Sequence, residues 1–268
     1  WSPQGDRIAT VAIEGNARVW DAASGEQIAE FTGHSDEVWG VTWSPGGEWV
    51  ASAGKDGTAR VWDPNTGEEK LILRGHTAGV RSVAWSPEGD WIATASDDGS
   101  ARIWKAETGD EHLLLLEQPN TVWSIAWSPD AARLVTAGED GIVRVWDAST
   151  GSELSDIRLP SPVWYAAWSP DGKQLATTRS DGLAQVWDAA SGVEAFSLQG
   201  RTPDYFTIAW SPDGKWLATT AGPDDSVRIW DASPIFTTLS EESGALAFAS
   251  WSPDGDRLAT VDYLERTV

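Results

Sequence analysis

The tripeptide Trp-Ser-Pro occurs seven times in this chain and recurs every 41 or 42 residues from one end to the other. The copies begin at Trp1, Trp43, Trp85, Trp127, Trp168, Trp210 and Trp251. A fixed period of about 40 residues is typical of repeat architectures, in which each repeat forms one small unit that packs against its neighbours. The period therefore constrains the fold more strongly than any other feature of the 268-residue sequence.

Residues 34–76 form the most regular copy, and turn-forming residues divide it into four short segments. We predict strands over residues 38–43, 48–53, 58–62 and 70–73. The segments are separated by Ser-Pro-Gly-Gly, Lys-Asp-Gly and Asp-Pro-Asn-Thr-Gly, which are turn sequences. No window shows a sustained 3.6-residue apolar period, so we expect almost no helix.

Gly-His pairs precede two of the copies, and a Trp-Asp pair ends the third segment of most copies. These pairs resemble the repeats of the WD40 β-propellers, and the resemblance covers the whole chain. It implies an all-β propeller of four-stranded antiparallel blades. TolB-like propellers are the structural alternative, because their repeats also open with Trp-Ser-Pro-Asp-Gly. The pairs are Gly33-His34, Gly75-His76, Trp20-Asp21, Trp62-Asp63, Trp146-Asp147, Trp187-Asp188 and Trp230-Asp231, with Trp104-Lys105 as a variant.

Seven copies predict a seven-bladed propeller whose first and last blades are incomplete in this chain. The first copy lacks its first strand, and the last copy stops at Val268, where a Trp-Asp segment is due. The chain also contains no Met. We therefore expect residues 1–268 to form a single propeller domain within a longer protein that carries fused domains.

The tryptophan of each Trp-Ser-Pro copy is predicted to pack between neighbouring blades. Burying one such ring stabilises the fold by roughly 2–3 kcal/mol or more. We expect five of these rings to be nearly fully buried, namely those of Trp43, Trp85, Trp127, Trp168 and Trp210.

The WD40 resemblance also implies a hydrogen-bonded tetrad of His, Ser or Thr, Asp and Trp within a blade. One set comprises His34, Ser52, Asp56 and Trp62, and a second comprises His76, Thr94, Asp98 and Trp104. A Ser-His-Asp trio can also serve nucleophilic catalysis. Because the trio recurs at identical phase and ends on a Trp donor, we interpret it as structural. We expect no enzyme activity, with a hydrolytic propeller as the remote alternative.

Three copies depart from the tetrad at its His position but keep its Asp. We expect these blades to depend more on Trp packing, with Gln118 donating to Asp140. Either Thr219 or Thr220 is expected to complete the set in the sixth copy. The replaced positions are Gln118, Leu159 and Arg201, and the retained carboxylates are Asp140, Asp181 and Asp224.

The net charge of −22, from 41 acidic and 19 basic residues, argues against a nucleic-acid partner. A basic protein segment fits this charge better. The chain has no Cys and three His, which leaves no thiolate or His-rich metal centre, and we expect no cofactor. No apolar run approaches the roughly 18 residues of a spanning helix, so we expect a cytoplasmic protein without membrane attachment.

The first strand of each copy carries a break in its apolar pattern. Its apolar residues stand five and two positions before each Trp-Ser-Pro, a spacing that does not fit the two-residue period of a strand. We infer a β-bulge, which re-aims the side chain between them. The residues at this position are Trp39, Arg81, Trp123, Trp164, Phe206 and Ala247, and Lys55, Asp97 and Glu139 precede the nearby turn Asp residues.

Strand direction places these bulge residues at the Gly-His end of the blades. Aromatic and Arg side chains gathered at one opening are typical of an interaction hot spot. We therefore predict a partner-binding rim of Trp39, Arg81, Trp123, Trp164 and Phe206, with Lys55, Asp97 and Glu139 beside it. The acidic neighbours are expected to favour a basic segment. The predicted function is a protein-binding scaffold or sensor domain in a larger signalling protein, resembling bacterial tandem WD40 domains.

Overall fold

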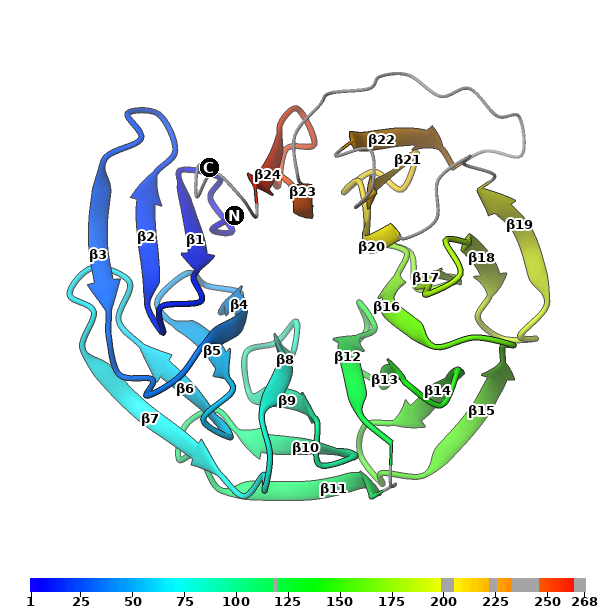
Figure 1. Ribbon diagram of the computed structural model, residues 1–268, viewed down its shortest axis with the longest axis horizontal. Coiled ribbons are helices and arrows are strands. Elements are labelled where there is room, and N and C mark those ends of the chain that lie inside the picture. The colour runs from blue at the N-terminus through cyan, green and yellow to red at the C-terminus, as the bar shows by residue number, and fades with distance from the viewer. Residues whose placement is uncertain (118–119, 199–204, 222–225, 233–245, 263–268) are drawn as a thin grey trace. The chain divides into compact units, whose positions relative to one another are not determined.

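A computed structural model describes residues 1–117, 120–198, 205–221, 226–232 and 246–262 of the chain. Within these residues the regular secondary structure is entirely β, with 24 strands in seven sheets (Figure 1). The strands follow one another in chain order within each sheet. The expected all-β architecture of antiparallel sheets is therefore confirmed.

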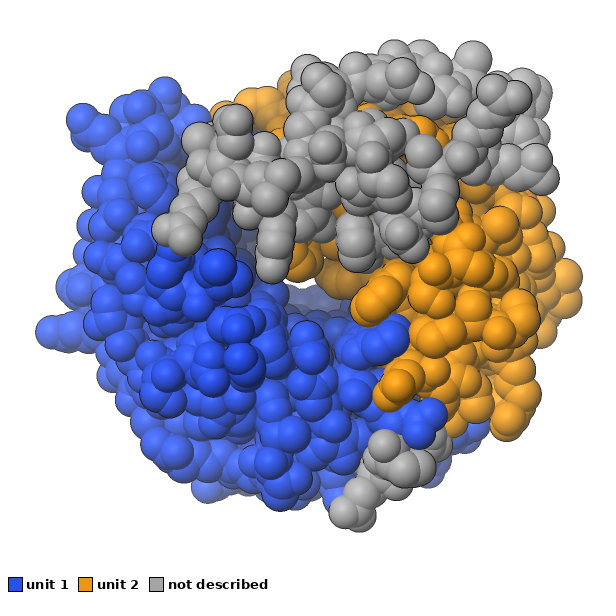
Figure 2. Space-filling view, viewed as in Figure 1, with its two compact units in different colours: residues 1–136, 145–154 blue, residues 137–144, 155–268 orange. Residues whose placement is uncertain are grey.

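Unit 1, blue in Figure 2, is one of two compact units and comprises residues 1–136 and 145–154. Its first sheet has three strands, β1 (Arg7–Val11), β2 (Ala17–Asp21) and β3 (Gln27–Phe31). The second sheet has β4 (Val38–Trp43), β5 (Val50–Gly54), β6 (Thr58–Trp62) and β7 (Glu69–Arg74). The third has β8 (Val80–Trp85), β9 (Trp91–Ser96), β10 (Ser100–Lys105) and β11 (Glu111–Glu117).

Unit 2, orange in Figure 2, comprises residues 137–144 and 155–268. It contains β16 (Val163–Trp168), β17 (Gln174–Arg179), β18 (Ala184–Asp188) and β19 (Glu194–Leu198). Two smaller sheets follow, β20 (Tyr205–Trp210) with β21 (Trp216–Ala221) and β22 (Ser226–Asp231), and β23 (Leu246–Trp251) with β24 (Leu258–Asp262). A further sheet, β12 (Val122–Trp127), β13 (Arg133–Gly138), β14 (Ile142–Asp147) and β15 (Glu153–Arg158), contributes residues to each unit.

Turn chemistry predicted the strands of the second sheet well. β4 and β6 match their predicted ranges, and β7 extends one residue further at each end. β5 begins at Val50 rather than at residue 48, because the preceding turn continues to Trp49. There the Ser44 N–H donates to the Trp49 carbonyl at 2.8 Å, and the Ser44 hydroxyl accepts from the Trp49 N–H at 3.0 Å.

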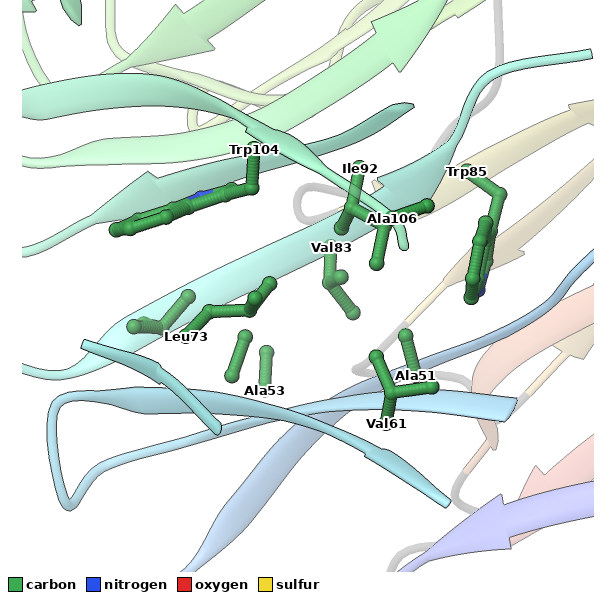
Figure 3. Packing of buried hydrophobic residues seen from close by; sticks show 11 residues of the cluster. Ala51, Ala53, Val61, Leu73, Val83, Trp85, Ile92, Trp104 and Ala106 are labelled. Carbon is green, nitrogen blue, oxygen red and sulfur yellow. The ribbon is translucent and has the colours of Figure 1, made fainter. Parts of the chain in front are cut away.

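The core consists of apolar layers between consecutive sheets. Figure 3 shows one such layer in unit 1, where small side chains of the β4–β7 sheet face larger ones of the β8–β11 sheet. Ala51 and Ala53 lie beneath Ile92 and Trp104, and all four are almost fully buried. Burial of apolar area at about 25 cal/mol per Å² makes these layers the main stabilising contribution. Each sheet is stable because its neighbour covers its face.

The Trp-Ser-Pro rings confirm the packing prediction in four of five cases. The exposed fractions of Trp85, Trp127, Trp168 and Trp210 lie between 7% and 9%. The prediction was wrong for Trp43, which is only half-buried. The Trp127 indole lies against β8, where its N–H donates to the Ala84 carbonyl at 3.2 Å. Within the described residues the β1–β3 sheet, which precedes β4, has only three strands and no counterpart of β8.

The turn between the third and fourth strands of a sheet covers the outer strand of the preceding sheet. A Cβ at Gly67, which has a φ of 73°, would lie 2.3 Å from the Glu30 carbonyl oxygen of β3. Glycine is therefore required at this position. The turn at Gly109 approaches β7 in the same way, since a Cβ there would lie 3.4 Å from Leu73 Cδ2.

Candidate functional site

The bulges predicted from the broken apolar period are present in the first strand of several sheets. The pairing of β4 with β5 skips from Val38 to Gly40, and the pairing of β8 with β9 skips from Val80 to Ser82. Equivalent shifts occur in β16, β20 and β23. The residues passed over include Trp39, Arg81, Trp164 and Ala247. The bulge predicted at Trp123 stays a prediction.

Two of these bulge residues meet directly in unit 1. The Cζ of Arg81 lies 3.9 Å from the centroid of the Trp39 ring, which is cation–π geometry. Both side chains are partly exposed. The two strands that carry them pack side by side, because a Cβ at Gly40 would lie 3.3 Å from the Arg81 carbonyl oxygen. The bulges therefore bring Trp39 and Arg81 together from different sheets.

Charged neighbours fix this pair from both sides. The Arg81 Nε donates to Asp97 Oδ1 at 2.7 Å, and the Trp39 Nε1 donates to Glu37 Oε2 at 3.0 Å. Lys55 donates to the other oxygen of Glu37 at 2.9 Å. Hydrogen bonds from Lys55 and Trp39 lower the pKa of Glu37, so its carboxylate stays ionised. The five side chains Lys55, Glu37, Trp39, Arg81 and Asp97 form one continuous chain of contacts, which we call the Trp39 cluster.

The backbone around the Trp39 cluster explains its position. The Lys55 N–H donates to the Glu37 carbonyl at 2.8 Å, which ties the turn after β5 to the start of β4. The Asp97 N–H donates to the Gly79 carbonyl in the same way, at 2.9 Å. A Cβ at Gly79 would lie 2.6 Å from Cζ3 of Trp39, so this glycine leaves room for the ring.

Other residues of the predicted rim lie elsewhere in the repeats. Trp123 is a half-buried residue of β12 in unit 1, and β12 packs against β8. Glu139, which is exposed, and Trp164, which is half-buried, belong to unit 2. Phe206 belongs to β20, and its side chain lies outside the described part of the chain. The structure therefore joins Trp39, Arg81, Lys55 and Asp97 into one cluster.

Sequence reasoning missed Glu37 and Gly79, and it did not foresee the ion pair of Asp97 with Arg81 of the same sheet. The expectation that Asp97 favours a basic partner stays a prediction. Glu37 and Gly79 occupy the same position in consecutive repeats, one residue before the first strand. An acidic residue followed two positions later by Trp was the available signal for Glu37.

The predicted tetrad is complete in the β8–β11 sheet. The Trp104 Nε1 donates to Thr94 Oγ1 at 2.8 Å, and Thr94 Oγ1 lies 2.7 Å from His76 Nε2. His76 Nδ1 lies 3.0 Å from Asp98 Oδ2. Since the Asp98 carboxylate only accepts, Nδ1 carries the proton and Nε2 accepts from the threonine hydroxyl. The hydrogen bonds therefore run in one direction. Trp104 donates to Thr94, Thr94 donates to His76, and His76 donates to Asp98.

The protonation states of this network follow from burial. Burial lowers the pKa of His76, so the imidazole is neutral. Burial alone would raise the pKa of Asp98, but hydrogen bonds from the Ser100 hydroxyl and from the Thr77 and Ser100 N–H groups lower it to about 2. The pair is a neutral histidine beside an ionised carboxylate.

The tetrad prediction was wrong at one bond in the β4–β7 sheet. His34 contacts Asp56 at 3.0 Å and Ser52 at 2.9 Å, as expected. The buried Trp62 Nε1, however, has no hydrogen-bond partner among the described residues. Ser52 lacks the second Cβ substituent that restricts the rotamer of a threonine, and its hydroxyl reaches only His34. The Trp62 ring instead stacks on Phe31, with a centroid distance of 5.4 Å and an interplanar angle of 7°.

Arginine takes over the histidine's role in two other sheets. Arg144 Nη1 donates to Asp140 Oδ2 at 2.6 Å. In the β16–β19 sheet Arg179 binds both oxygens of Asp181 and donates from Nη1 to Gln185 Oε1 at 2.9 Å. The expectation that these blades depend more on Trp packing did not foresee these arginine–carboxylate pairs. The predicted roles of Gln118, Arg201 and Asp224 lie outside the described residues.

Each tetrad tryptophan except Trp62 donates to a threonine ten or eleven residues before it. In the β20–β22 sheet that threonine is Thr219, while Thr220 pairs with Thr207 at 3.1 Å. This settles which of the two threonines completes the set. The acceptors are Thr10, Thr94, Thr136, Thr177 and Thr219.

The Ser-His-Asp geometry of the β4–β7 sheet has no access for a substrate. Ser52 is fully buried, and the His34 side chain is equally inaccessible. Nucleophilic attack needs the hydroxyl within reach of the reacting carbonyl. The trio therefore stabilises the sheet. Among the described residues no group of three or more His, Cys, Asp or Glu side chains is placed to hold a metal ion, and no helix is long and apolar enough to cross a membrane.

Repeated antiparallel sheets with His–Asp pairs at their turns and Trp-to-Thr hydrogen bonds at their centres define a WD40-type β-propeller. Comparison with known families agrees. The profile described as the IFT122 first beta-propeller matches residues 1–182, and the profile of the WD domain, G-beta repeat, matches residues 193–231. The chain belongs to the IFT122 first beta-propeller family. A search of curated proteins found no matching relative. WD40 propellers are in general non-catalytic scaffolds for protein interactions.

Proposed function

We propose that this protein binds a protein or peptide segment at the Trp39 cluster and the neighbouring start of β12. The observation that carries the proposal is the stacked Trp39–Arg81 pair, which is partly exposed and held on both sides by hydrogen bonds. Trp and Arg are the residues most enriched in interaction hot spots. Fixed side chains lose little conformational entropy on binding, so this surface is suited to a rigid recognition platform.

The partner is a protein segment that is basic overall. The net charge of −22 supports this, because a strongly acidic protein attracts basic partners and repels nucleic-acid backbones. Asp36 adds an exposed acidic group before β4, and Glu139 adds one in the turn between β13 and β14. By repeat position, Trp123, Trp164 and Phe206 extend the same kind of surface.

In the wider proposal the seven sheets are blades of one propeller over residues 1–268, with the first and last blades incomplete in this chain. The propeller serves as a sensor domain of a cytoplasmic, bacterial-type signalling protein with fused domains. The WD40 repeats support the sensor, and a TolB-like accessory propeller is the alternative. The reading frames on either side decide between them, since a signalling module favours the sensor and a secretion signal favours the accessory role.

The Trp39 surface is tested by removing its aromatic side chains. In a Trp39→Ala, Trp123→Ala double variant we expect affinity for the captured partner to fall by about 2 kcal/mol, roughly thirtyfold. The matched control is Trp49→Ala. Trp49 is half-buried like Trp39 but lies at the other end of the β4–β5 pair, beside Val50 and Trp43.

The measurement compares capture of partners from source lysate by wild type, the double variant and the control. Thermal melts of all three proteins accompany it. A partner that binds wild type and Trp49→Ala but not the double variant supports the proposal. If the double variant melts like wild type and keeps every partner, the Trp39 surface is not the binding surface.

A further inference from the structure

Arg81 uses only part of its hydrogen-bonding capacity within the protein. A guanidinium carries five N–H donors, and the Arg81 Nε donates to Asp97. The two terminal nitrogens have no hydrogen-bond partner among the described residues. The side chain is 39% exposed, so water or a ligand reaches these donors. Four N–H groups therefore have no hydrogen-bond partner within the described part of the protein.

The free edge of Arg81 is held in a defined orientation. The guanidinium carbon lies over the Trp39 ring, and Asp97 binds the Nε side. Trp39 is itself positioned by Glu37 and by the close approach of Gly79. A planar guanidinium held in this way matches a carboxylate through two parallel hydrogen bonds.

The other cation of the cluster is already neutralised. Lys55 lies 2.9 Å from Glu37 and 3.5 Å from Asp36, so its charge is shared between two carboxylates of the protein. Among the described residues Arg81 forms an ion pair with Asp97 only, through its Nε. It is thus the group of this cluster that is best placed to receive an anion.

We propose that Arg81 binds an Asp or Glu side chain of the partner segment. This inference rests on the proposed function of the Trp39 surface. The segment is basic overall but presents one carboxylate at a fixed position. Distant charges are screened over about 8 Å at physiological ionic strength, whereas contact pairs are screened much less. The overall negative charge of the protein attracts the basic segment as it approaches. Once the segment is in contact, Arg81 sets its register through a charge-assisted, bidentate hydrogen bond to the carboxylate.

A random peptide library displayed on phage tests this inference. Peptides are selected on wild type and counter-selected on the Trp39→Ala, Trp123→Ala variant, so that those retained depend on this surface. We expect them to be rich in Lys and Arg and to share an Asp or Glu at one position. Selection on Arg81→Gln is expected to remove that shared acidic residue while the basic residues remain.

A synthetic peptide from the selection then gives the magnitude. Replacing its shared Glu with Gln, or its shared Asp with Asn, is expected to weaken binding to wild type by about tenfold or more and to have little effect on Arg81→Gln. Arg81→Lys should lose most of the preference for the carboxylate, because an ammonium keeps the charge without the planar fork. The matched control Arg74→Gln removes one exposed charge from β7 and should retain the full preference.

A Gly79→Ala variant separates the effect of the position of the Trp39 ring from the effect of the Arg81–carboxylate contact. Its methyl group displaces the Trp39 ring, so we expect binding of the carboxylate and amide peptides to fall together. If no peptide depends on Trp39 and Trp123, the proposed function fails and the inference fails with it. If such peptides exist but share no acidic residue, or keep it on Arg81→Gln, the inference alone is overturned.

Discussion

The β8–β11 sheet of unit 1 and the β16–β19 sheet of unit 2 solve the same problem with different side chains. In both, an indole N–H donates to a buried threonine, from Trp104 to Thr94 at 2.8 Å and from Trp187 to Thr177 at 2.9 Å. In the first sheet a neutral histidine links that threonine to a carboxylate. In the second the threonine has no histidine, and an arginine binds the carboxylate independently.

The difference shows that the carboxylate is the constant requirement and its partner is exchangeable. Asp98 accepts from the Ser100 N–H and so shapes the turn between β9 and β10, and Asp140 accepts from the Ile142 N–H in the same way. A buried or partly buried carboxylate needs donors around it. Histidine and arginine both supply them, but only histidine joins the carboxylate to the Trp–Thr pair.

The largest expected effect comes from removing the linking histidine. His76→Ala leaves Asp98 and Thr94 without their shared partner in a buried site, so we expect a loss of about 2–3 kcal/mol in the free energy of unfolding. Leu159→Ala, at the same repeat position before β16, should cost about 1 kcal/mol, because Arg179 still holds Asp181. Denaturant unfolding measures both. Equal losses would show that the histidine contributes only packing.

The two threonines sharpen the same comparison. Thr94→Val orphans both the Trp104 donor and the His76 acceptor, and we expect it to cost about 2 kcal/mol. Thr177→Val orphans only the Trp187 donor and should cost about 1 kcal/mol. The valine keeps the shape of the side chain, so chemical denaturation reports the hydrogen bonds. A larger loss at Thr177 would contradict the connected network.

Acid should distinguish the two kinds of sheet by a smaller effect. Burial lowers the pKa of His34 and His76 below the unfolded value of 6.5, so the unfolded chain binds more protons. Stability is therefore expected to fall as the pH drops from about 7.5 to about 5.5. In a His76→Gln variant the slope should be shallower. The pKa of about 2 for Asp98 adds a second loss below 3.8, as its carboxylate protonates.

The smallest effect is a gain. In Ser52→Thr we expect the buried Trp62 N–H to donate to the threonine hydroxyl, as the equivalent tryptophans do in five other sheets, with a stabilisation of about 0.5–1 kcal/mol. The equivalent site accommodates threonine in five other sheets. A rise in melting temperature, with Ser52→Ala as the control, checks this. No gain or a loss would mean that the Phe31 stack, rather than the missing methyl group, holds Trp62 away.

Local rules account for what could be predicted from the sequence. The strands and turns of residues 34–76 follow from Pro, Gly and Asp positions, and the bulges at Trp39 and Arg81 follow from a broken two-residue period. These features depend on a few consecutive residues and repeat in phase. The His76 tetrad was accessible for the same reason, once the WD40 resemblance assigned its members.

The contacts that could not be predicted from the sequence depend on where the ends of long side chains lie in the folded protein. Arg179 reaches Asp181 because the position holds Arg, whereas the other repeats hold Gly, Ser, Ala or Asp there, and no periodic pattern indicates that bond. The stacking of Arg81 on Trp39 joins residues 42 positions apart in different sheets. Trp62 stacks on Phe31, and its N–H has no acceptor among the described residues. Such contacts require the folded arrangement of both partners.

The glycine turn that covers the preceding outer strand also imposes an order on synthesis at the ribosome. β7 leaves the ribosome before the turn at Gly109, which contacts the Leu71 and Leu73 side chains and is made only after β8, β9 and β10. Each repeat is thus protected by the one translated after it. Apolar side chains that stay uncovered during synthesis are sites for association between chains. Pauses in translation are therefore expected to be least harmful just after a covering turn has emerged and most harmful just before it.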